Sequence, residues 1–327
     1  MPISTTSTRR IRAGLVAAAL TVATALAPSA ALANGAAVST VSTASAAAVL
    51  TSPSWVGQYE TQIGNDPATV YYPAAQTPLP VALLLQGANV PRESYSEFAK
   101  IVAGFGFAVA VPNHQRAVGP ISGLFPEQSQ TNAAVTWAAA ENTRAGSPVA
   151  GRLDANRLVL LGHSFGGAAG LFAIGNTCTV PFCFGPVYQR PAALRAAVFY
   201  GASTTTPGGG AVPIANAGVP VALVQGGLDG NNLPAAALAT YNALGAAPKA
   251  LVTVTGANHF GLTDTQTPPG AVPDATPQTL TQQESIDAAA KWSGLFLRAS
   301  LGDTLAAAYV YGFGDASDPK VTVISQR

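Results

Sequence analysis

Three residues far apart in this sequence have the types and the order needed for nucleophilic acyl transfer. Ser164 lies in the pentapeptide Gly162-His163-Ser164-Phe165-Gly166. Asp229 is the one acidic residue between Ser164 and His259, and His259 is the one histidine after Ser164. A serine hydroxyl needs an adjacent base to become a good nucleophile, and an acidic group holds that base in the correct tautomer. The sequence therefore offers a single Ser164–His259–Asp229 triad.

The residues around Ser164 predict a sharp turn from a strand into a helix. Residues 157–161 form an apolar run typical of a buried strand, and residues 166–174 begin with Gly and Ala. Such a turn requires small neighbours, because larger side chains would collide, and it lifts the serine hydroxyl out of the sheet. An ordinary glycine-rich turn would give the same local pattern, so the distant Asp229 and His259 favour the catalytic interpretation.

Asp229 and His259 each follow a predicted strand. Asp229 comes after the run 221–225, and His259 lies in a loop after the run 251–255. Open α/β sheets place their sites at the carboxyl ends of strands, where these two residues are expected. The pair Asp229-Gly230 is also a turn signal, which is the alternative interpretation.

The two other histidines are expected to have structural roles. His163 is adjacent to Ser164, and the side chains of neighbouring residues diverge. His114 follows a predicted strand and is interpreted as a satisfied loop or core histidine, with a contact to the pocket as the alternative. Neither replaces His259 as the base.

A tetrahedral intermediate of acyl transfer requires two N–H donors for its oxyanion. One is expected from the backbone of Phe165, the residue after the nucleophile, and the other from the loop 86–89. By position, the second donor is predicted to be the Ala88 N–H.

Strand-forming runs alternate with helical patterns along the chain, which predicts an α/β fold with a mainly parallel central sheet and helices on both faces. The predicted strands are 69–72, 81–85, 107–111, 157–161, 196–200, 221–225 and 251–255. The predicted helices are 94–103, 131–144, 166–174, 233–244 and 281–301. The last of these opens with a Thr281–Glu284 capping box.

The N-terminus reads as an export signal. Arginines at 9, 10 and 12 precede an apolar run at 13–27, and Ala31-Leu32-Ala33 is a small-x-small cleavage site. We predict a signal peptide at 1–33, cleaved near Ala33, a flexible leader at 34–53 and one catalytic domain at 54–327. The arginine pair leaves the twin-arginine route open beside the general one. The apolar run is short for a membrane anchor, so no integral membrane segment is expected in the mature chain.

Composition narrows the partners. The net charge is +1 and 9% of residues are charged, and no basic run suggests a nucleic-acid partner.

Cys178 and Cys183 are predicted to form a disulfide in an exported chain, with two buried thiols as the alternative. No metal site is expected, because no histidine or acid lies near this pair. The insertion 177–191 is predicted to be a stapled loop that either supplies an apolar wall of the cleft or serves stability alone.

Together these features resemble the α/β-hydrolase superfamily, and within it secreted bacterial esterases of the chlorophyllase, dienelactone-hydrolase-like and platelet-activating-factor-acetylhydrolase-like group. The segments that carry the resemblance are Pro80–Gly87, Phe105–Val109, Gly162–Gly167 and Gly256–Thr263. Many relatives have His-Gly where this chain has Gln86-Gly87. The resemblance implies a secreted serine carboxylesterase that needs no metal or organic cofactor and acts on a small-molecule or lipid-like ester.

Alternative functions remain at the same site. Lipase, amidase or acyltransferase activity would use the same residues, as would polyester hydrolysis. Cutinase-like enzymes usually have a tryptophan after the strand that follows the nucleophile helix, and this chain has Tyr200 there. A catalytically silent binding protein on the same fold is the remaining alternative.

Overall fold

The structure is a computed structural model that describes residues 55–74, 78–185 and 187–327. The predicted signal peptide and leader lie outside the described residues, so their boundaries stay predictions. All described residues belong to one compact unit. No helix within the described ranges is both long and apolar enough to cross a membrane.

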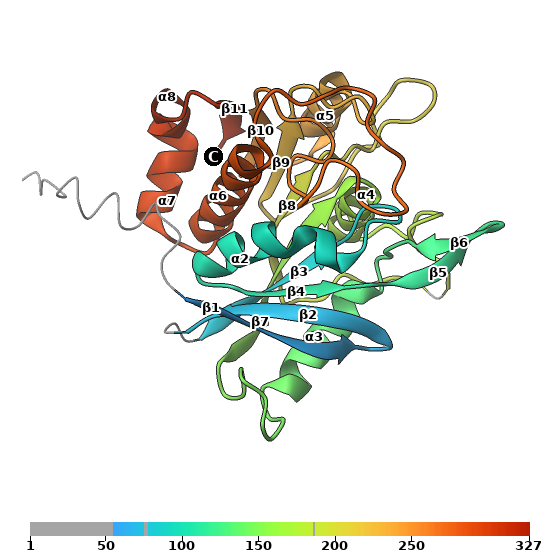
Figure 1. The fold of residues 1–327 in the computed structure, drawn as a ribbon, viewed down its shortest axis with the longest axis vertical. Coiled ribbons are helices and arrows are strands. Elements are labelled where there is room, and N and C mark those ends of the chain that lie inside the picture. Colours follow the sequence, from blue (N-terminus) through green and yellow to red (C-terminus); the bar gives the residue numbers. More distant parts are fainter. Residues whose placement is uncertain (1–54, 75–77, 186) are drawn as a thin grey trace, which may run out of the picture. The chain divides into compact units, whose positions relative to one another are not determined.

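A nine-stranded, mostly parallel sheet forms the centre of the fold (Figure 1). In spatial order its strands are β1 (Val56–Ile63), β2 (Asp66–Pro73), β4 (Ala108–Pro112), β3 (Leu79–Leu85), β7 (Leu153–His163), β8 (Leu194–Tyr200), β9 (Val221–Gly226), β10 (Lys249–Val254) and β11 (Val321–Gln326). The six strands from β4 to β10 in this order pair in parallel, whereas β1, β2 and β11 pair antiparallel at the two edges. This sheet confirms the predicted α/β fold.

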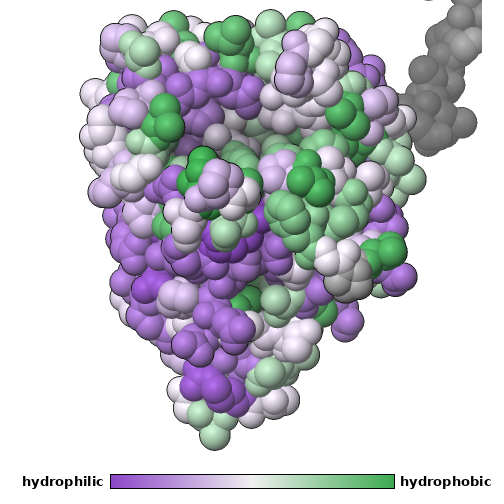
Figure 2. Space-filling model, turned by 90° about the vertical axis from the view of Figure 1, so that its right-hand side faces the viewer, coloured by the Kyte–Doolittle hydropathy of each residue, from purple (hydrophilic) through white to green (hydrophobic). Residues whose placement is uncertain are grey.

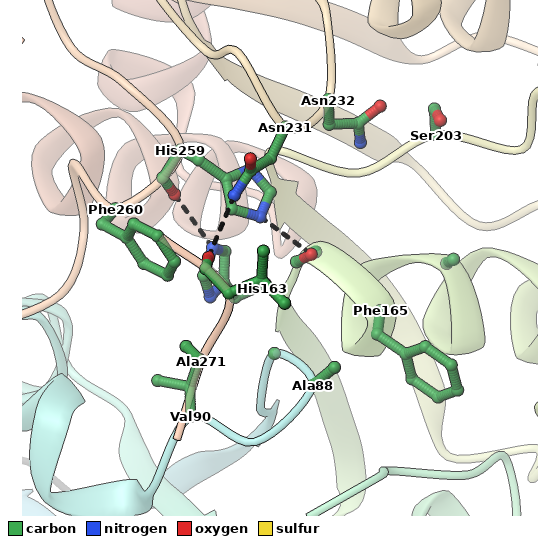
Figure 3. A pocket seen from close by; sticks show the side chains of 14 residues that line it. Ala88, Val90, His163, Phe165, Ser203, Asn231, Asn232, His259, Phe260 and Ala271 are labelled. Atoms are coloured by element: carbon green, nitrogen blue, oxygen red, sulfur yellow. Dashed lines mark hydrogen bonds between the residues drawn. The ribbon is translucent and has the colours of Figure 1, made fainter. Parts of the chain in front are cut away.

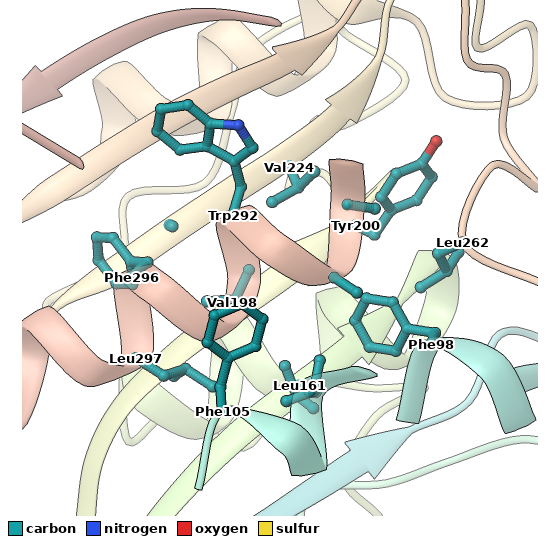
Figure 4. Close-up of a cluster of buried hydrophobic side chains, with 14 of the residues drawn as sticks. Phe98, Phe105, Leu161, Val198, Tyr200, Val224, Leu262, Trp292, Phe296 and Leu297 are labelled. Carbon is teal, nitrogen blue, oxygen red and sulfur yellow. The ribbon is translucent and has the colours of Figure 1, made fainter. Parts of the chain in front are cut away.

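Helices cover both faces of the sheet. They are α2 (Ser96–Gly104), α3 (Gln130–Glu141), α4 (Ser164–Ile174), α5 (Pro234–Ala243), α6 (Gln282–Ser300), α7 (Thr304–Ala308) and α8 (Gly314–Ser317), with short helices η1 (Arg92–Tyr95) and η2 (Tyr309–Phe313). One hydrophobic cluster joins α2 and α6 to one face of the sheet, and a second joins α3, α4 and α5 to the other. Because successive strand residues point to opposite faces, β7 contributes Leu161 to the first cluster and Leu160 to the second. Figure 4 shows Leu161, Phe105 and Trp292 among the side chains of the first cluster.

The predicted elements correspond to seven strands and five helices of the structure, with boundaries that differ by a few residues. The predicted capping box is present, since Thr281 and Glu284 bond each other's backbone N–H groups. The helix predicted to reach 144 ends at Glu141, because the Asn142 side chain bonds both the N–H and the C=O of Leu153 at the start of β7.

Four strands were not predicted. In the edge strands β1 and β11, exposed residues alternate with less exposed ones, so these strands lack the continuous apolar runs that identify the central strands. The hairpin of β5 (Gln115–Val118) and β6 (Ile121–Leu124) is mostly exposed and projects from the body of the fold (Figure 1). Figure 2 shows a hollowed upper face with hydrophobic side chains around it and a mainly hydrophilic lower part.

Candidate active site

Ser164 occupies a strained turn between β7 and α4. Its φ of +52° lies in the left-handed region, which costs a residue with a side chain about 1–2 kcal/mol. The flanking glycines are steric requirements of this turn. A Cβ on Gly166 would overlap the Leu85 carbonyl oxygen, and one on Gly162 would lie 2.9 Å from the Gly167 Cα. The Gly-x-Ser-x-Gly pattern therefore allows β7 and α4 to meet closely enough to present Ser164 at the end of the sheet.

The structure brings Ser164, His259 and Asp229 together in one hydrogen-bonded chain. The His259 Nε2 lies 2.9 Å from the Ser164 Oγ. The His259 Nδ1 lies 2.9 Å from Oδ2 and 3.0 Å from Oδ1 of Asp229. A carboxylate only accepts, so Nδ1 carries the ring proton and Nε2 is free to accept the proton of the serine hydroxyl. Figure 3 shows the His259 ring among the residues that line the neighbouring cavity.

Asp229 is buried and its oxygens are held by further donors. Oδ1 accepts the backbone N–H groups of Asn231 and Asn232 at 3.0 Å and 2.7 Å. Oδ2 accepts from the Gln225 side chain at 3.1 Å. Asp229 therefore orders the turn after β9 and also orients His259. The interpretation as the acid of the triad and the interpretation as a turn residue are thus compatible.

Asp274 is a second carboxylate at the site, and the sequence did not identify it. Its Oδ2 accepts the His259 backbone N–H at 2.9 Å and the Gly230 N–H at 3.1 Å, and its Oδ1 accepts the Thr276 N–H at 2.8 Å. It thus ties the loop that carries His259 to the loop that carries Asp229. The short Asp274-Ala275-Thr276 turn is the only sequence signal for this role, since backbone donors leave no pattern of residue types.

The loop after β3 presents one uncommitted N–H at the cavity. Gly87 donates to the Tyr95 hydroxyl at 2.8 Å, Asn89 to the Leu124 carbonyl at 2.8 Å, and Val90 to the Gly87 carbonyl at 3.1 Å. The Ala88 N–H donates to no group among the described residues. Both Ala88 and Phe165 line the cavity. The Phe165 N–H lies in the first turn of α4, where helix N–H groups have no partner within the helix.

The two remaining histidines, His163 and His114, have structural contacts, and neither is placed to act as the base for Ser164. His163 is fully buried, and its ring bonds the His259 carbonyl rather than Ser164. His114 pairs through Nδ1 with Asp66 at 2.8 Å and does not line the cavity. The Gln86 side chain, at the position where the resemblance expects histidine, is also fully buried.

A cavity of about 470 Å³ opens beside Ser164. Its lining comprises Gly87, Ala88, Val90, His163, Ser164, Phe165, Ala168, Ser203, Asn231, Asn232, His259, Phe260, Ala271 and Val272. In Figure 3 the polar Asn232 and Ser203 lie above the His259 ring, and Ala88 and Val90 lie below it. No Asp, Glu, Lys or Arg side chain from the described ranges lines it, so the cavity is suited to uncharged groups. The described residues also contain no cluster of His, Cys, Asp and Glu that could hold a metal ion.

The predicted disulfide between Cys178 and Cys183 is present. It closes a loop from which Phe182 packs on Phe165 and Phe172, with ring centroids 4.7 Å and 5.4 Å apart. None of the described residues of the 177–191 insertion lines the cavity, so the expectation that it forms the apolar wall directly is corrected. The loop instead supports Phe165, which lines the cavity, from behind.

Comparison with known families gives a match over part of the chain. The family model described as Chlorophyllase matches residues 48–180, which include β3, the loop after it and the turn at Ser164. Asp229 and His259 lie beyond the matched residues. No curated protein matches this chain.

Proposed function

We propose that this chain is a serine carboxylesterase of the α/β-hydrolase superfamily that works through an acyl-enzyme. The match to the Chlorophyllase family model and the mostly parallel sheet support this proposal. The observation that carries the proposal is the unbroken hydrogen-bonded chain from the Ser164 Oγ through His259 to Asp229. In this proposal Ser164 attacks the ester carbonyl while the His259 Nε2 takes the hydroxyl proton. Asp229 holds the ring and stabilises the imidazolium, as its two contacts with Nδ1 support.

The oxyanion of the tetrahedral intermediate would be bound by the Ala88 and Phe165 N–H groups. The uncommitted Ala88 N–H and the helix-end position of the Phe165 N–H support this assignment. His259 then returns its proton to the leaving alcohol, whose C–O bond breaks. A water molecule, deprotonated by the same ring, releases the acid from Ser164. The Ala88 and Phe165 N–H groups would each stabilise negative charge that develops only as the transition state forms.

The cavity lining supports an uncharged ester as the substrate. A charged acyl or alcohol group would lose its hydration without gaining an oppositely charged partner. Lipid-like and polyester substrates share this neutral chemistry and remain alternatives at the same site. A panel of p-nitrophenyl esters should therefore show that neutral short acyl chains are cleaved faster than a carboxylate-bearing chain of equal length.

The decisive experiment replaces Ser164 by Ala. Turnover of p-nitrophenyl butyrate should fall by up to about 10⁶-fold, as when a triad serine is removed. Ser300→Ala is a matched control, because Ser300 lies at the end of α6 and its hydroxyl bonds the Phe296 carbonyl and no other described residue. Labelling of the wild-type protein by a fluorophosphonate separates the enzyme from a silent binding protein. Turnover retained near the wild-type rate in Ser164→Ala, or an unlabelled Ser164, would refute the proposal.

We also propose that the protein is exported. The signal-like segment 1–33 and the disulfide of Cys178 and Cys183 support this, since such bonds persist in oxidising compartments. Mass spectrometry of the protein recovered from culture medium should give an N-terminus close to Asn34. An intact N-terminus on protein retained in the cell would contradict export.

A further inference from the structure

A buried chain of hydrogen bonds runs beneath the cavity and joins two of its loops. It starts at the His259 carbonyl, 2.9 Å from the His163 Nε2. It continues from the His163 Nδ1 to the Tyr95 hydroxyl at 3.0 Å, and from there to the Gly87 N–H at 2.8 Å. The side chains of His163 and Tyr95 are both fully buried. Neither takes part in the proton transfers described above.

The chemistry of the groups fixes the direction of every bond. A carbonyl only accepts, so the His163 Nε2 donates to His259. Burial, reinforced by the nearby His259, holds the pKa of His163 well below its usual range, so the ring is neutral and Nδ1 accepts. Burial also raises the pKa of Tyr95, so its hydroxyl keeps its proton and donates it to Nδ1. The Tyr95 oxygen then accepts the Gly87 N–H, and each group in the chain has its partner.

This chain anchors the loop on one side of Ala88. Gly87 is held by Tyr95, while on the other side Asn89 donates to the Leu124 carbonyl at 2.8 Å. His163 also packs directly on the loop, because a Cβ on Gly87 would lie 2.7 Å from the His163 Nδ1. The Ala88 N–H, which has no partner among the described residues, thus lies between two neighbours whose own N–H groups are held.

We propose that His163 and Tyr95 are positioning residues that set the Ala88 N–H relative to His259, so that oxyanion binding and proton transfer are aligned on one ester. The inference rests on the proposed function, since an aimed N–H matters only if an oxyanion forms. Neither residue touches the reacting atoms in this proposal. They act through Gly87 and through the His259 carbonyl, and their effect belongs to the transition state rather than to substrate binding.

Tyr95→Phe tests the proposal, because it removes the hydroxyl and keeps the ring. We expect kcat on p-nitrophenyl butyrate to fall about 10- to 100-fold, less than the 10²–10³ of a lost donor, with KM changed by less than about threefold. The inhibition constant of a trifluoromethyl ketone, which forms an oxyanion adduct with serine, should rise by the same factor as kcat falls. Tyr71→Phe is the matched control and should keep wild-type kinetics. It removes a partly buried hydroxyl that bonds Ser96, and Tyr71 belongs to the same hydrophobic cluster as Tyr95.

A second pair of variants separates hydrogen bonding from packing. His163→Gln retains one donor and one acceptor, whereas His163→Met fills similar space with neither. Gln should retain at least about tenfold more kcat than Met, because loss of partners leaves buried polar groups unpaired. In the wild-type protein, nitrogen NMR of the three histidines should show one ring that stays neutral, with its proton on Nε2, from pH 5 to 9.

The outcomes distinguish the two proposals. An inactive wild-type protein refutes the proposed function. If the wild-type protein is active, three results would each refute the positioning role. These are an unchanged kcat in Tyr95→Phe, an equal loss of kcat in Tyr71→Phe, and an inhibition constant that does not rise as kcat falls. A His163 ring that titrates in this range, or that carries its proton on Nδ1, refutes it without any variant.

Discussion

The backbone strain at Ser164 predicts that Ser164→Gly should be more stable than Ser164→Ala, although both variants are inactive. Ser164→Ala and Ser164→Gly both lose the hydroxyl and its bond to His259. Alanine keeps a Cβ in the left-handed conformation at φ +52°, whereas glycine adopts that conformation without penalty. The difference between the two variants therefore isolates the strain from the loss of the hydrogen bond.

The expected magnitude follows from two opposing effects. Relief of the left-handed conformation contributes about 1–2 kcal/mol. Glycine gives back about 0.5–1 kcal/mol, because its unfolded chain has more freedom to lose. At the midpoints of these two ranges, Ser164→Gly should exceed Ser164→Ala in the free energy of unfolding by about 0.75 kcal/mol, or in Tm by about 1.5–3 °C for a chain of this size.

Thermal unfolding of both variants, followed by circular dichroism at pH 7, measures this difference. Ser293 in the middle of α6 supplies the matched control, since glycine there should be less stable than alanine by about 0.5–1 kcal/mol. Opposite signs at the two positions are the expected result. Equal stability of the two Ser164 variants, or a less stable Ser164→Gly, would refute the idea that this turn stores strain.

Three further predictions concern the Asp274 turn, the first turn of α6 and the disulfide loop. Asp274→Asn places an N–H₂ group near backbone donors, so kcat should fall about 10- to 100-fold with KM nearly unchanged in steady-state assays. Hydrogen bonds with Thr281 lower the pKa of Glu284 from 4.5 to about 2. Between these two pH values the folded state binds fewer protons than the unfolded state, so the free energy of unfolding falls as the pH drops through this range. The Tm deficit of Glu284→Gln should accordingly be present at pH 6 and shrink below pH 4. Replacing Cys178 and Cys183 by Ser should lower stability by about 2 kcal/mol for so short a loop, and unchanged thermal unfolding would contradict this.

The central sheet could be predicted because its strands are buried on both faces. Their continuous apolar runs, such as Val81–Leu85, separate cleanly from the helical patterns between them. The meeting of Ser164, Asp229 and His259 could be predicted because acids and histidines are scarce in this chain and the strand order brings loop ends together. Their catalytic role stays a prediction, which the Ser164 variants test.

The residues that hold the loops could not be predicted in the same way. Asp274, Tyr95 and His163 bond backbone N–H and C=O groups, which every residue carries, so their partners are not encoded by residue type. A distance of 68 residues separates Tyr95 from His163, and only the fold brings them together. Periodicity predicted the helix that contains Tyr95 and the strand that precedes His163, and it gave no sign of the contacts of these residues.

These contacts share a consequence for how the site tolerates change. Each of the loops that carry Ala88, Asp229 and His259 is fixed through its main chain by a side chain from another segment. A substitution in such a side chain leaves the reacting groups present but lets their loop shift, and a shift of about 1 Å can cost about 10²-fold in rate. Variants that lower kcat while sparing KM should therefore be found beyond the residues that line the cavity, at positions that bond the backbone of these three loops.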